Sequence, residues 1–289
     1  MEWAEPMQCD PCQSGGDALA RKRDAGLHAF GARRILGMRV DASTYARAVR
    51  AILEMAETGG GTTCVATVHM VMEAYDDPAF QRILSSADLV TSDGMPLVWT
   101  LRARGLREAE RVYGPDLVPA VCAAAAAHGV PVGLYGGSPD VIARLPQRLA
   151  LRFPGLRIAF AASPPYREMT PEEDVAVVDA IRDSGVRILF VGLGCPKQEL
   201  WMAAHREQLS CAMVGVGAAF DFLAGAKRQA PRWAQRVGLE WLFRLACEPR
   251  RLWRRYAWHN PRFAWLAGRE ILRAWMNDLP GQGIRGAGR

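Results

Sequence analysis

The chain has 289 residues, of which half are hydrophobic and 23% are charged. This composition is typical of a globular protein with a well-buried core and excludes a disordered or fibrous chain. No segment reaches the run of about 18 apolar residues that a membrane-spanning helix needs. The best candidate, residues 118–127, contains Pro119, and we expect a buried helix there instead.

The net charge of +6 is unevenly distributed along the chain. Residues 1–224 carry 22 Lys and Arg against 26 Asp and Glu, whereas residues 225–289 carry 14 against 4. Six of the nine tryptophans also lie in this last segment. A basic, tryptophan-rich segment suits a polyanionic partner, such as nucleic acid, an anionic membrane surface or phosphate groups.

The seven cysteines predict neither a disulfide framework nor a zinc site. Their number is odd, and the only CxxC pair, Cys9 and Cys12, has no second pair to complete a metal site. Residues 1–10 contain two glutamates and lack the apolar core of a signal peptide. We therefore expect a cytoplasmic protein with reduced cysteines.

Strand and helix patterns alternate between residues 31 and 224, after an N-terminal segment, residues 1–30, that we expect to be a loose extension. The predicted strands are 64–70, 87–93, 130–135, 156–162, 186–192 and 211–217. The predicted helices are 44–57, 71–86, 95–104, 114–128, 139–152, 171–184 and 197–209. This alternation predicts an α/β, Rossmann-like, mostly parallel sheet with helices on both faces.

The pattern changes after Gly225. Residues 232–276 show no strand signal and are rich in Arg, Leu and Trp. Because proline ends helices, Pro231, Pro249 and Pro261 are expected to divide this segment into helices of about 12 to 16 residues. The sequence thus predicts a C-terminal helical appendage over residues 225–278, followed by a flexible tail, 279–289.

Polar or glycine-rich residues lie at the carboxyl ends of five of the predicted strands. In an open parallel sheet, ligands bind beyond the carboxyl ends of the strands, so these residues together predict a pocket. The segments are Thr67-Val-His69, Asp93-Gly94, Gly136-Gly137-Ser138, Gly192-Leu-Gly-Cys-Pro-Lys-Gln-Glu199 and Gly215-Val-Gly-Ala-Ala-Phe-Asp221.

Asp93 is the main candidate for a catalytic residue. It ends a strand ahead of Gly94, where a carboxylate can accept a proton from a bound hydroxyl. An Asx-turn, or an N-cap for the next helix, explains the same position equally well. Asp221 is expected to be structural. His69 can hydrogen-bond a substrate, although a lone histidine at a strand end is more often a structural residue.

The glycine-rich loops have two interpretations. Gly136-Gly137 and Gly192-x-Gly194 can bring backbone N–H groups close to a phosphate, or they can simply turn the chain. Neither loop has the GxGxxG spacing, which disfavours a dinucleotide-dependent oxidoreductase, and the absence of GxxxxGK[ST] excludes a P-loop NTPase.

The appendage offers cationic groups in place of a metal. Arg244, Arg251 and Arg254 have spacings that would place them on one helical face, and guanidinium groups pair bidentately with phosphate. A solvated charged face is the alternative, while the interleaved Trp253, Tyr256 and Trp258 favour a membrane interface or a polyanion. The chain contains no Asp-x-Asp, the pair with which many nucleotide-sugar transferases hold a metal.

The order of the longer motifs resembles a known family, the WecG/TagA/CpsF glycosyltransferases of glycosyltransferase family 26. The resemblance spans about residues 37–263. It rests on Ala87-Asp-Leu-Val-Thr-Ser-Asp-Gly-Met-Pro96, Gly192-Leu-Gly-Cys-Pro-Lys-Gln-Glu199, Gly215-Val-Gly-Ala-Ala-Phe-Asp-Phe222, Arg228-Gln-Ala-Pro231, Gly238-Leu-Glu-Trp241 and Arg244-Leu-x-x-Glu-Pro-x-Arg-Leu-x-x-Arg-Tyr256.

The resemblance implies inverting transfer of a sugar from a UDP-sugar without a metal or other cofactor. The implied acceptor is a sugar on a polyprenyl diphosphate lipid at the inner face of the cell membrane, where the appendage holds the enzyme on the anionic surface. The implied products are intermediates of bacterial surface polysaccharides, including exopolysaccharide. The donor sugar, the acceptor sugar and the oligomeric state stay open.

The resemblance also assigns roles to individual residues. Asp93 corresponds to the general base, and Thr67, the position of His69, and Gln198 correspond to substrate-binding residues. Arg244, Arg251 and Arg254 correspond to arginines that close over the site and hold the diphosphate. The family commonly has Asn where this chain has His69, so the hydrogen-bonding at that position is expected to differ.

The main alternative is a non-enzymatic α/β scaffold whose basic, aromatic appendage binds nucleic acid. Affinity would then fall steeply with salt, and no sugar would be transferred. This interpretation leaves the polar residues at the strand ends without a role. We therefore expect the partners to be sugar substrates and a membrane surface, not nucleic acid.

Overall fold

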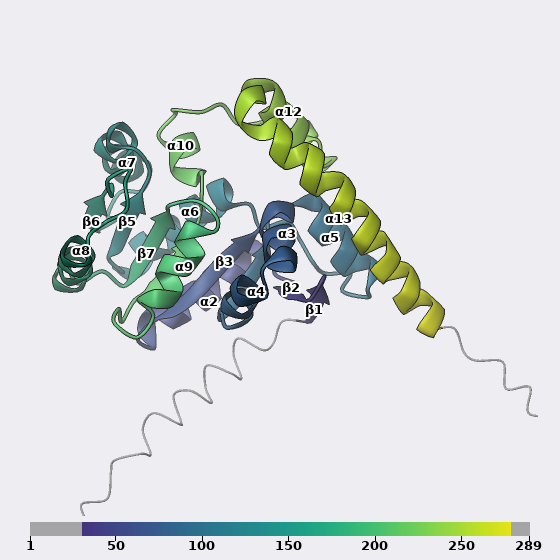
Figure 1. Cartoon of the computed structure of the whole chain (residues 1–289). Helices are drawn as coiled ribbons and strands as arrows, with labels where there is room; N and C mark the ends of the chain where they lie inside the picture. Colours follow the sequence, from purple (N-terminus) through teal and green to yellow (C-terminus); the bar gives the residue numbers. More distant parts are fainter. Residues whose placement is uncertain (1–30, 279–289) are drawn as a thin grey trace, which may run out of the picture.

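The computed structural model describes residues 31–278, so the predicted extension 1–30 and tail 279–289 lie outside the described residues. Its centre is a six-stranded sheet in the order β4-β3-β8-β7-β5-β6, with every neighbouring pair parallel (Figure 1). The predicted α/β, Rossmann-like fold is confirmed. The strands are β3 Gly61–Ala66, β4 Leu89–Ser92, β5 Val132–Gly136, β6 Ile158–Ala162, β7 Ile188–Gly192 and β8 Ala212–Gly215.

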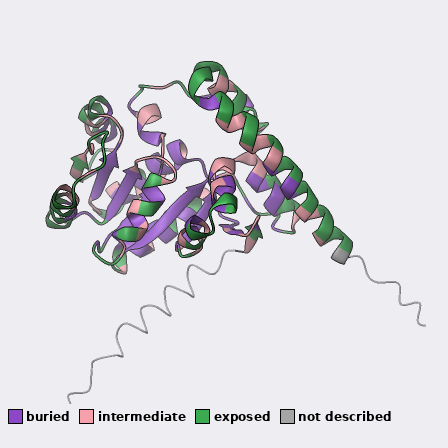
Figure 2. Cartoon of the chain, viewed as in Figure 1, coloured by how far each residue is buried: buried purple, intermediate pink, exposed green. Residues whose placement is uncertain are grey.

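Helices cover both faces of this sheet, and alternate strand residues pack against opposite layers. In β7, Leu189 and Val191 join one hydrophobic cluster, whereas Ile188 and Phe190 join the other. The first cluster includes residues of α3 Val68–Asp76, α4 Pro78–Ser85, α5 Met95–Ala103, α8 Pro171–Asp183 and α9 Lys197–Ala204. The second includes residues of α2 Tyr45–Glu57, α6 Gly114–His128, α7 Pro139–Arg152 and α10 Ala219–Leu223. The buried strands between these layers form the core (Figure 2).

A small antiparallel hairpin precedes the sheet and was not predicted. It consists of β1 Ala32–Ile35 and β2 Met38–Asp41, joined by Leu36 and Gly37, which both have positive φ. Two such residues form the tight turn that hairpins favour. Asp41 ties the hairpin to the sheet, because its buried Oδ2 accepts a hydrogen bond of 2.8 Å from the Val90 backbone N.

Two predicted boundaries around His69 and Asp77 are wrong. The strand that was expected to run to residue 70 ends at Ala66, and Thr67 caps α3 by accepting a hydrogen bond from the Met70 N–H. His69 is therefore in the first turn of a helix and not at a strand end. The helix expected over residues 71–86 is interrupted at Asp77, which caps α4 ahead of Pro78, because proline favours a new helix start.

The appendage is helical, as predicted, but its division differs. Its helices are α11 Arg232–Arg236, α12 Glu240–Cys247 and α13 Pro249–Asp278. The helix α13 has 30 residues and passes through Pro261, so the expected break there is wrong. The buried residues Leu252, Phe263 and Leu266 lie on both sides of Pro261, and their packing offsets the roughly 3 kcal/mol that an interior proline costs.

The helix α13 lies along the body (Figure 1), and polar contacts fasten it there. Arg262 pairs with Asp76 of α3 through two contacts of 2.6 Å. Further along, Glu270 accepts hydrogen bonds of 3.0 Å from the Leu36 backbone N and from Arg104. The appendage thus lies across α3 and α5, beside the carboxyl ends of β3 and β4. Within residues 31–278, no helix is both long enough and apolar enough to span a bilayer.

Candidate active site

Asp93 lies directly after β4, at the edge of the sheet where the sequence predicts a pocket. Its backbone N donates a hydrogen bond of 2.8 Å to the Ala66 carbonyl, so the ends of β3 and β4 stay paired and Thr67 is its neighbour. The N-cap residue of α5 is Gly94, and no side chain forms a capping hydrogen bond at the start of this helix. The Asp93 carboxylate therefore does not cap this helix.

The carboxylate instead faces Arg111. The segment between α5 and α6 runs along the end of β4, since the Val112 N donates to the Ser92 carbonyl at 2.8 Å and the Ser92 hydroxyl donates to the Glu110 carbonyl at 3.0 Å. This pairing brings the Arg111 side chain to Asp93. Its Nη2 donates to Asp93 Oδ1 at 3.1 Å, and its Nε donates to the Asp93 backbone carbonyl.

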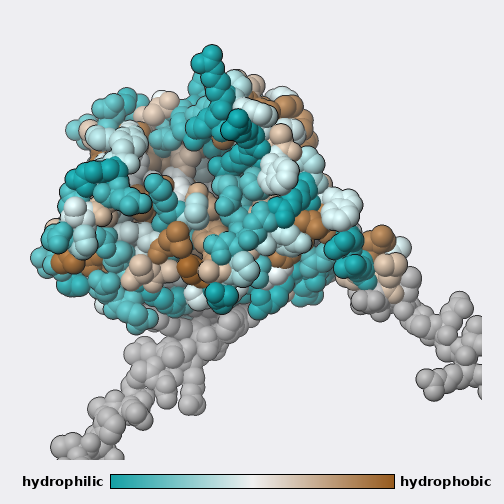
Figure 3. Space-filling view, viewed as in Figure 1, coloured by the Kyte–Doolittle hydropathy of each residue, from teal (hydrophilic) through white to brown (hydrophobic). Residues whose placement is uncertain are grey.

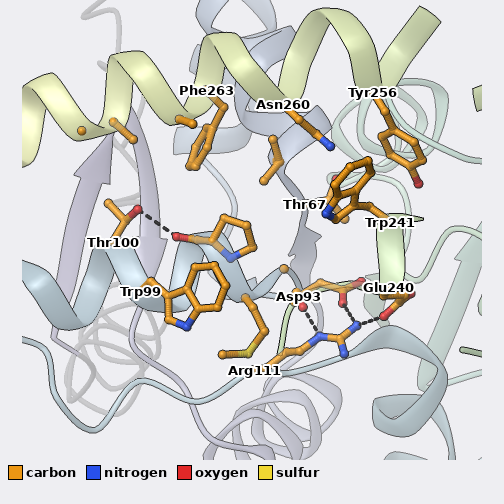
Figure 4. A pocket seen from close by; sticks show the side chains of 18 of the residues that line it. Thr67, Asp93, Trp99, Thr100, Arg111, Glu240, Trp241, Tyr256, Asn260 and Phe263 are labelled. Carbon is orange, nitrogen blue, oxygen red and sulfur yellow. Dashed lines mark hydrogen bonds and ion pairs between the residues drawn. The ribbon is translucent and has the colours of Figure 1, made fainter. Parts of the chain in front are cut away.

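Arg111 also reaches the appendage. Its Nη2 donates to Glu240 Oε2 at the start of α12, and its guanidinium lies 4.2 Å from the centre of the Tyr113 ring. Asp93, Arg111 and Glu240 are each less than one-fifth exposed. A buried cation is thus shared between two carboxylates, one from the body and one from the appendage (Figure 4).

This environment suits Asp93 to proton transfer. Burial raises the pKa of the Asp93 carboxyl to about 6, although the Arg111 charge lowers it, and the Glu240 carboxylate contributes to the rise. A catalytic base works best with a pKa close to the working pH, where it is ionised but still takes up a proton readily. Asp93 is therefore a carboxylate at neutral pH and a stronger base than an exposed aspartate.

A cavity of about 520 Å³ opens beside Asp93, between α5 on the body and α12 and α13 on the appendage (Figure 4). Its charged end holds Asp93, Arg111, Glu240 and Arg244, next to Thr67. Away from this end the walls are mostly apolar, and they include Pro96, Trp99, Phe263, Ala264, Ala267 and Ile271. The cavity can thus hold a polar group at Asp93 and an apolar chain along α13.

The predicted substrate-binding residues fall into two groups. Thr67 and Arg244 line the cavity with Asp93. Gln198 is 3% exposed in α9, and its Oε1 accepts hydrogen bonds from the backbone N of Gly217 at 3.0 Å and of Gly194 at 3.3 Å. Gln198 therefore fixes the loops that follow β7 and β8. It does not line the cavity beside Asp93.

Gly136 and Gly137 have a packing role. A Cβ on Gly136 would lie 2.5 Å from the Gly192 carbonyl, and both glycines have positive φ, so a side chain at either position would be strained. The Gly137 N donates to the Gly192 carbonyl at 3.0 Å. The glycines bring the ends of β5 and β7 together, which is the chain-turning alternative that the sequence left open; a phosphate contact there stays a prediction.

The three appendage arginines do not share one helical face, so that prediction is wrong. Arg244 is in α12, whereas Arg251 and Arg254 are in α13, because the chain bends at Glu248-Pro249. Arg244 lines the cavity, and Arg251 and Arg254 are exposed. Arg251 pairs with Glu248, and Arg254 lies 5.4 Å from the Trp253 ring centre.

Two residues of the site, Arg111 and Glu240, could not be predicted from the sequence. Arg111 follows a helix in an irregular segment, with no periodicity to mark it. Glu240 stands in the motif Gly238-Leu-Glu-Trp241, yet nothing in that motif indicates that its partner is a body arginine. Asp221, expected to be structural, pairs with Lys227 at 2.8 Å.

Only one group of side chains among residues 31–278 has the arrangement of a metal site, namely His69, Glu73 and His259. These residues belong to α3 and α13, and Asp93 is not among them.

A comparison with protein families identifies the family of the chain. The model of the glycosyl transferase WecG/TagA/CpsF family matches residues 33–277, which is most of the chain. The match includes the body, Asp93, Arg111 and the appendage residues Glu240 and Arg244. The chain belongs to the WecG/TagA/CpsF glycosyltransferase family and is thus a glycosyltransferase of surface polysaccharide biosynthesis.

Proposed function

We propose that the protein transfers a sugar from a UDP-sugar to a sugar on a polyprenyl diphosphate lipid, with inversion at the anomeric carbon and without a catalytic metal. The observation that carries this proposal is the cavity between body and appendage. A carboxylate with a pKa of about 6 lies at its charged end, and apolar side chains line the rest. A lipid-linked sugar has the same division into a polar and an apolar part.

The reaction follows from the chemistry of Asp93. The carboxylate removes the proton from the acceptor hydroxyl, and the oxygen attacks the anomeric carbon from the face opposite the UDP group. The new C–O bond forms as the bond to the diphosphate oxygen breaks, and the electron pair leaves on UDP. Inversion follows from a single displacement of this kind.

The leaving diphosphate needs positive charge. Arg244 supplies one guanidinium at the cavity, and Arg251 and Arg254 supply two more on the exposed surface of the next helix. Guanidinium groups stabilise developing phosphate charge through bidentate hydrogen bonds. In this proposal the arginines take the place of the metal that other nucleotide-sugar transferases use.

Residues at the strand ends bind the rest of the substrates. Thr67, beside Asp93, orients the acceptor sugar. His69, in the first turn of α3, is not among the residues that line the cavity, and the proposal gives it no contact with the sugar. Gly136 and Gly137 contribute to donor binding through the loop after β5. Gln198 acts on the donor through the two loop N–H groups that it holds in place.

The appendage holds the enzyme on an anionic membrane. Its exposed side chains include Trp253, Trp258, Trp265 and Trp275, interleaved with arginines. On the face shown in Figure 3, hydrophilic side chains run along α13 and hydrophobic ones gather towards its C-terminal end. Tryptophan at the headgroup level and arginine on anionic lipid would place the cavity at the inner surface of the bilayer.

The proposal is tested by offering a panel of UDP-sugars with synthetic polyprenyl-diphosphate-linked sugars, with no Mg²⁺ or Mn²⁺ added. Mass spectrometry of the lipid product identifies the donor sugar that is transferred, and NMR of its anomeric proton gives the configuration. We expect one donor to give an inverted product. Absence of product with every donor, or a product with retained configuration, contradicts the proposal.

A further inference from the structure

Two histidines and a glutamate meet where the appendage crosses the body. His69 and Glu73 are one turn apart on α3, and His259 comes from α13. Glu73 Oε1 lies 3.4 Å from His69 Nδ1 and 3.5 Å from His259 Nε2. The two imidazole rings are edge to face, with their centres 5.1 Å apart.

These distances match the coordination sphere of a small transition-metal ion. A tetrahedral zinc ion with bonds of about 2.0–2.1 Å keeps its ligand atoms about 3.3–3.4 Å apart. The two pairs that involve Glu73 Oε1 are close to this separation, and all three ligand atoms lie within 4.8 Å of one another. Small side-chain rotations therefore bring the three atoms around one ion.

The two histidines offer their ring nitrogens inside the protein and not to solvent, since their side chains are only 14% and 12% exposed. His69 Nδ1, the atom that faces Glu73, is buried and makes no hydrogen bond within the described part of the chain.

The charged group in direct contact with both imidazoles is a carboxylate. Arg255 is close enough to lower the pKa of both histidines, and alone it would suit a phosphate. The Glu73 carboxylate, however, lies between the two imidazoles, where it would repel an anion. With two neutral nitrogens and one carboxylate oxygen, the donor set is that of zinc and its neighbours.

We propose that His69, Glu73 and His259 bind a divalent zinc-type ion that links α13 of the appendage to α3 of the body. None of the three ligands contacts Asp93, so the ion is structural and the displacement at the sugar needs no charge from it. The ion fixes the helix whose Phe263 and Ala267 form the apolar wall of the cavity. The sequence alone does not indicate this site, because His259 is far along the chain from His69 and Glu73.

The test uses full-length protein with Cys9→Ser and Cys12→Ser, which removes the CxxC pair as a competing ligand. Co²⁺ is the probe, since it replaces Zn²⁺ and reports tetrahedral coordination by its visible absorption. We expect one equivalent of Co²⁺ to bind with a Kd of about 1 μM or below, to be displaced by Zn²⁺, and to raise Tm by about 5 °C or more at a hundredfold excess over Kd.

The variants His259→Ala and Glu73→Gln should lose the Co²⁺ spectrum and the rise in Tm, whereas His128→Ala, on the exposed surface of α6, should keep both. Circular dichroism without metal checks that each variant is folded. Glu73→Gln provides a second, conservative test if His259→Ala unfolds. Absence of Co²⁺ binding by the parent, or a spectrum that survives both variants, overturns the proposal.

Discussion

The Asp93 carboxylate, at the end of a body strand, is joined to Glu240 of the appendage through a single guanidinium, that of Arg111. Burial is the main cause of the raised pKa of Asp93, and the Glu240 charge contributes to it, so docking of the appendage adds to the basicity of the proposed catalytic residue. The appendage therefore acts on the chemistry as well as forming one wall of the cavity.

The pH dependence of transfer tests this relationship. Asp93 must be ionised to act as a base, so kcat/KM is expected to fall as the pH falls through about 6, the raised pKa of its carboxyl. Glu240→Gln removes a negative charge near Asp93, and the Arg111 guanidinium then pairs with the Asp93 carboxylate only. Both effects lower the pKa of Asp93, so the acid limb of the kcat/KM profile should move to lower pH.

Glu172→Gln, on the exposed surface of α8, is the matched control and should leave the profile unchanged. An acid limb that stays in place in Glu240→Gln refutes the coupling between Glu240 and Asp93.

Removal of Arg111 should destabilise the protein in a pH-dependent way. In Arg111→Gln, the carboxylates of Asp93 and Glu240 are left buried without their cation, which costs roughly 3–5 kcal/mol. For a chain of this size, that corresponds to a fall in Tm of about 6–15 °C.

The loss in Arg111→Gln should be largest at pH 7.5 and smaller at pH 5. Without the Arg111 charge the native-state pKa of Asp93 rises further, so at pH 5 this carboxyl is protonated and one of the two unpaired charges disappears. Arg182→Gln breaks an exposed pair with Asp179 and should cost less than about 1 kcal/mol. An equal fall in Tm at both pH values would show that the loss is one of packing.

The apolar wall of the cavity should determine how well the enzyme uses acceptors with a long polyprenyl chain. Ala264 lines the cavity from α13, and Ala264→Phe places an aromatic ring in the proposed path of the polyprenyl chain. We expect KM for a long-chain acceptor to rise about tenfold or more, with little change for a short-chain analogue, since each buried CH₂ contributes about 0.8 kcal/mol. Ala257→Phe, at an exposed position of the same helix, is the control. Equal effects of Ala264→Phe on both acceptors would place the lipid elsewhere.

The exposed arginines should govern binding to anionic membranes. Each arginine near an anionic surface contributes about 1 kcal/mol, so the double variant Arg251→Gln and Arg254→Gln should bind vesicles containing phosphatidylglycerol about 30-fold more weakly at low salt. The control double variant, Arg144→Gln and Arg152→Gln, changes exposed residues of α7. Flotation of protein with vesicles measures both, and an equal loss in the two variants would indicate general charge attraction only.

The sheet and the position of Asp93 could be predicted from the sequence because both depend on local patterns. Buried strands read as short apolar runs, and glycine or a polar residue follows where each strand ends, as Ser92-Asp93-Gly94 does. The capping box of Thr170 and Glu173 is equally local, since its hydrogen bonds join residues three apart.

The partners of Asp93 could not be predicted because they depend on tertiary contacts. Arg111 reaches Asp93 only through backbone pairing beside β4, and Glu240 reaches it only when the appendage folds back. His69 was misplaced because the strand pattern continues past Thr67, where the threonine hydroxyl instead starts a helix. The continuous helix through Pro261 likewise depends on packing of α13 against the body.

The proposed role of Asp93 is tested by comparing the wild-type protein with Asp93→Asn in the transfer assay, with UDP-sugar binding measured by calorimetry on both. The amide keeps the shape of the side chain but cannot take the proton, so turnover should fall by about 10²–10⁴ while the affinity for the UDP-sugar stays within a few-fold. Asp179→Asn, an exposed carboxylate of α8, should leave both unchanged. An Asp93→Asn enzyme that turns over at nearly the wild-type rate would contradict the assignment of Asp93 as the base.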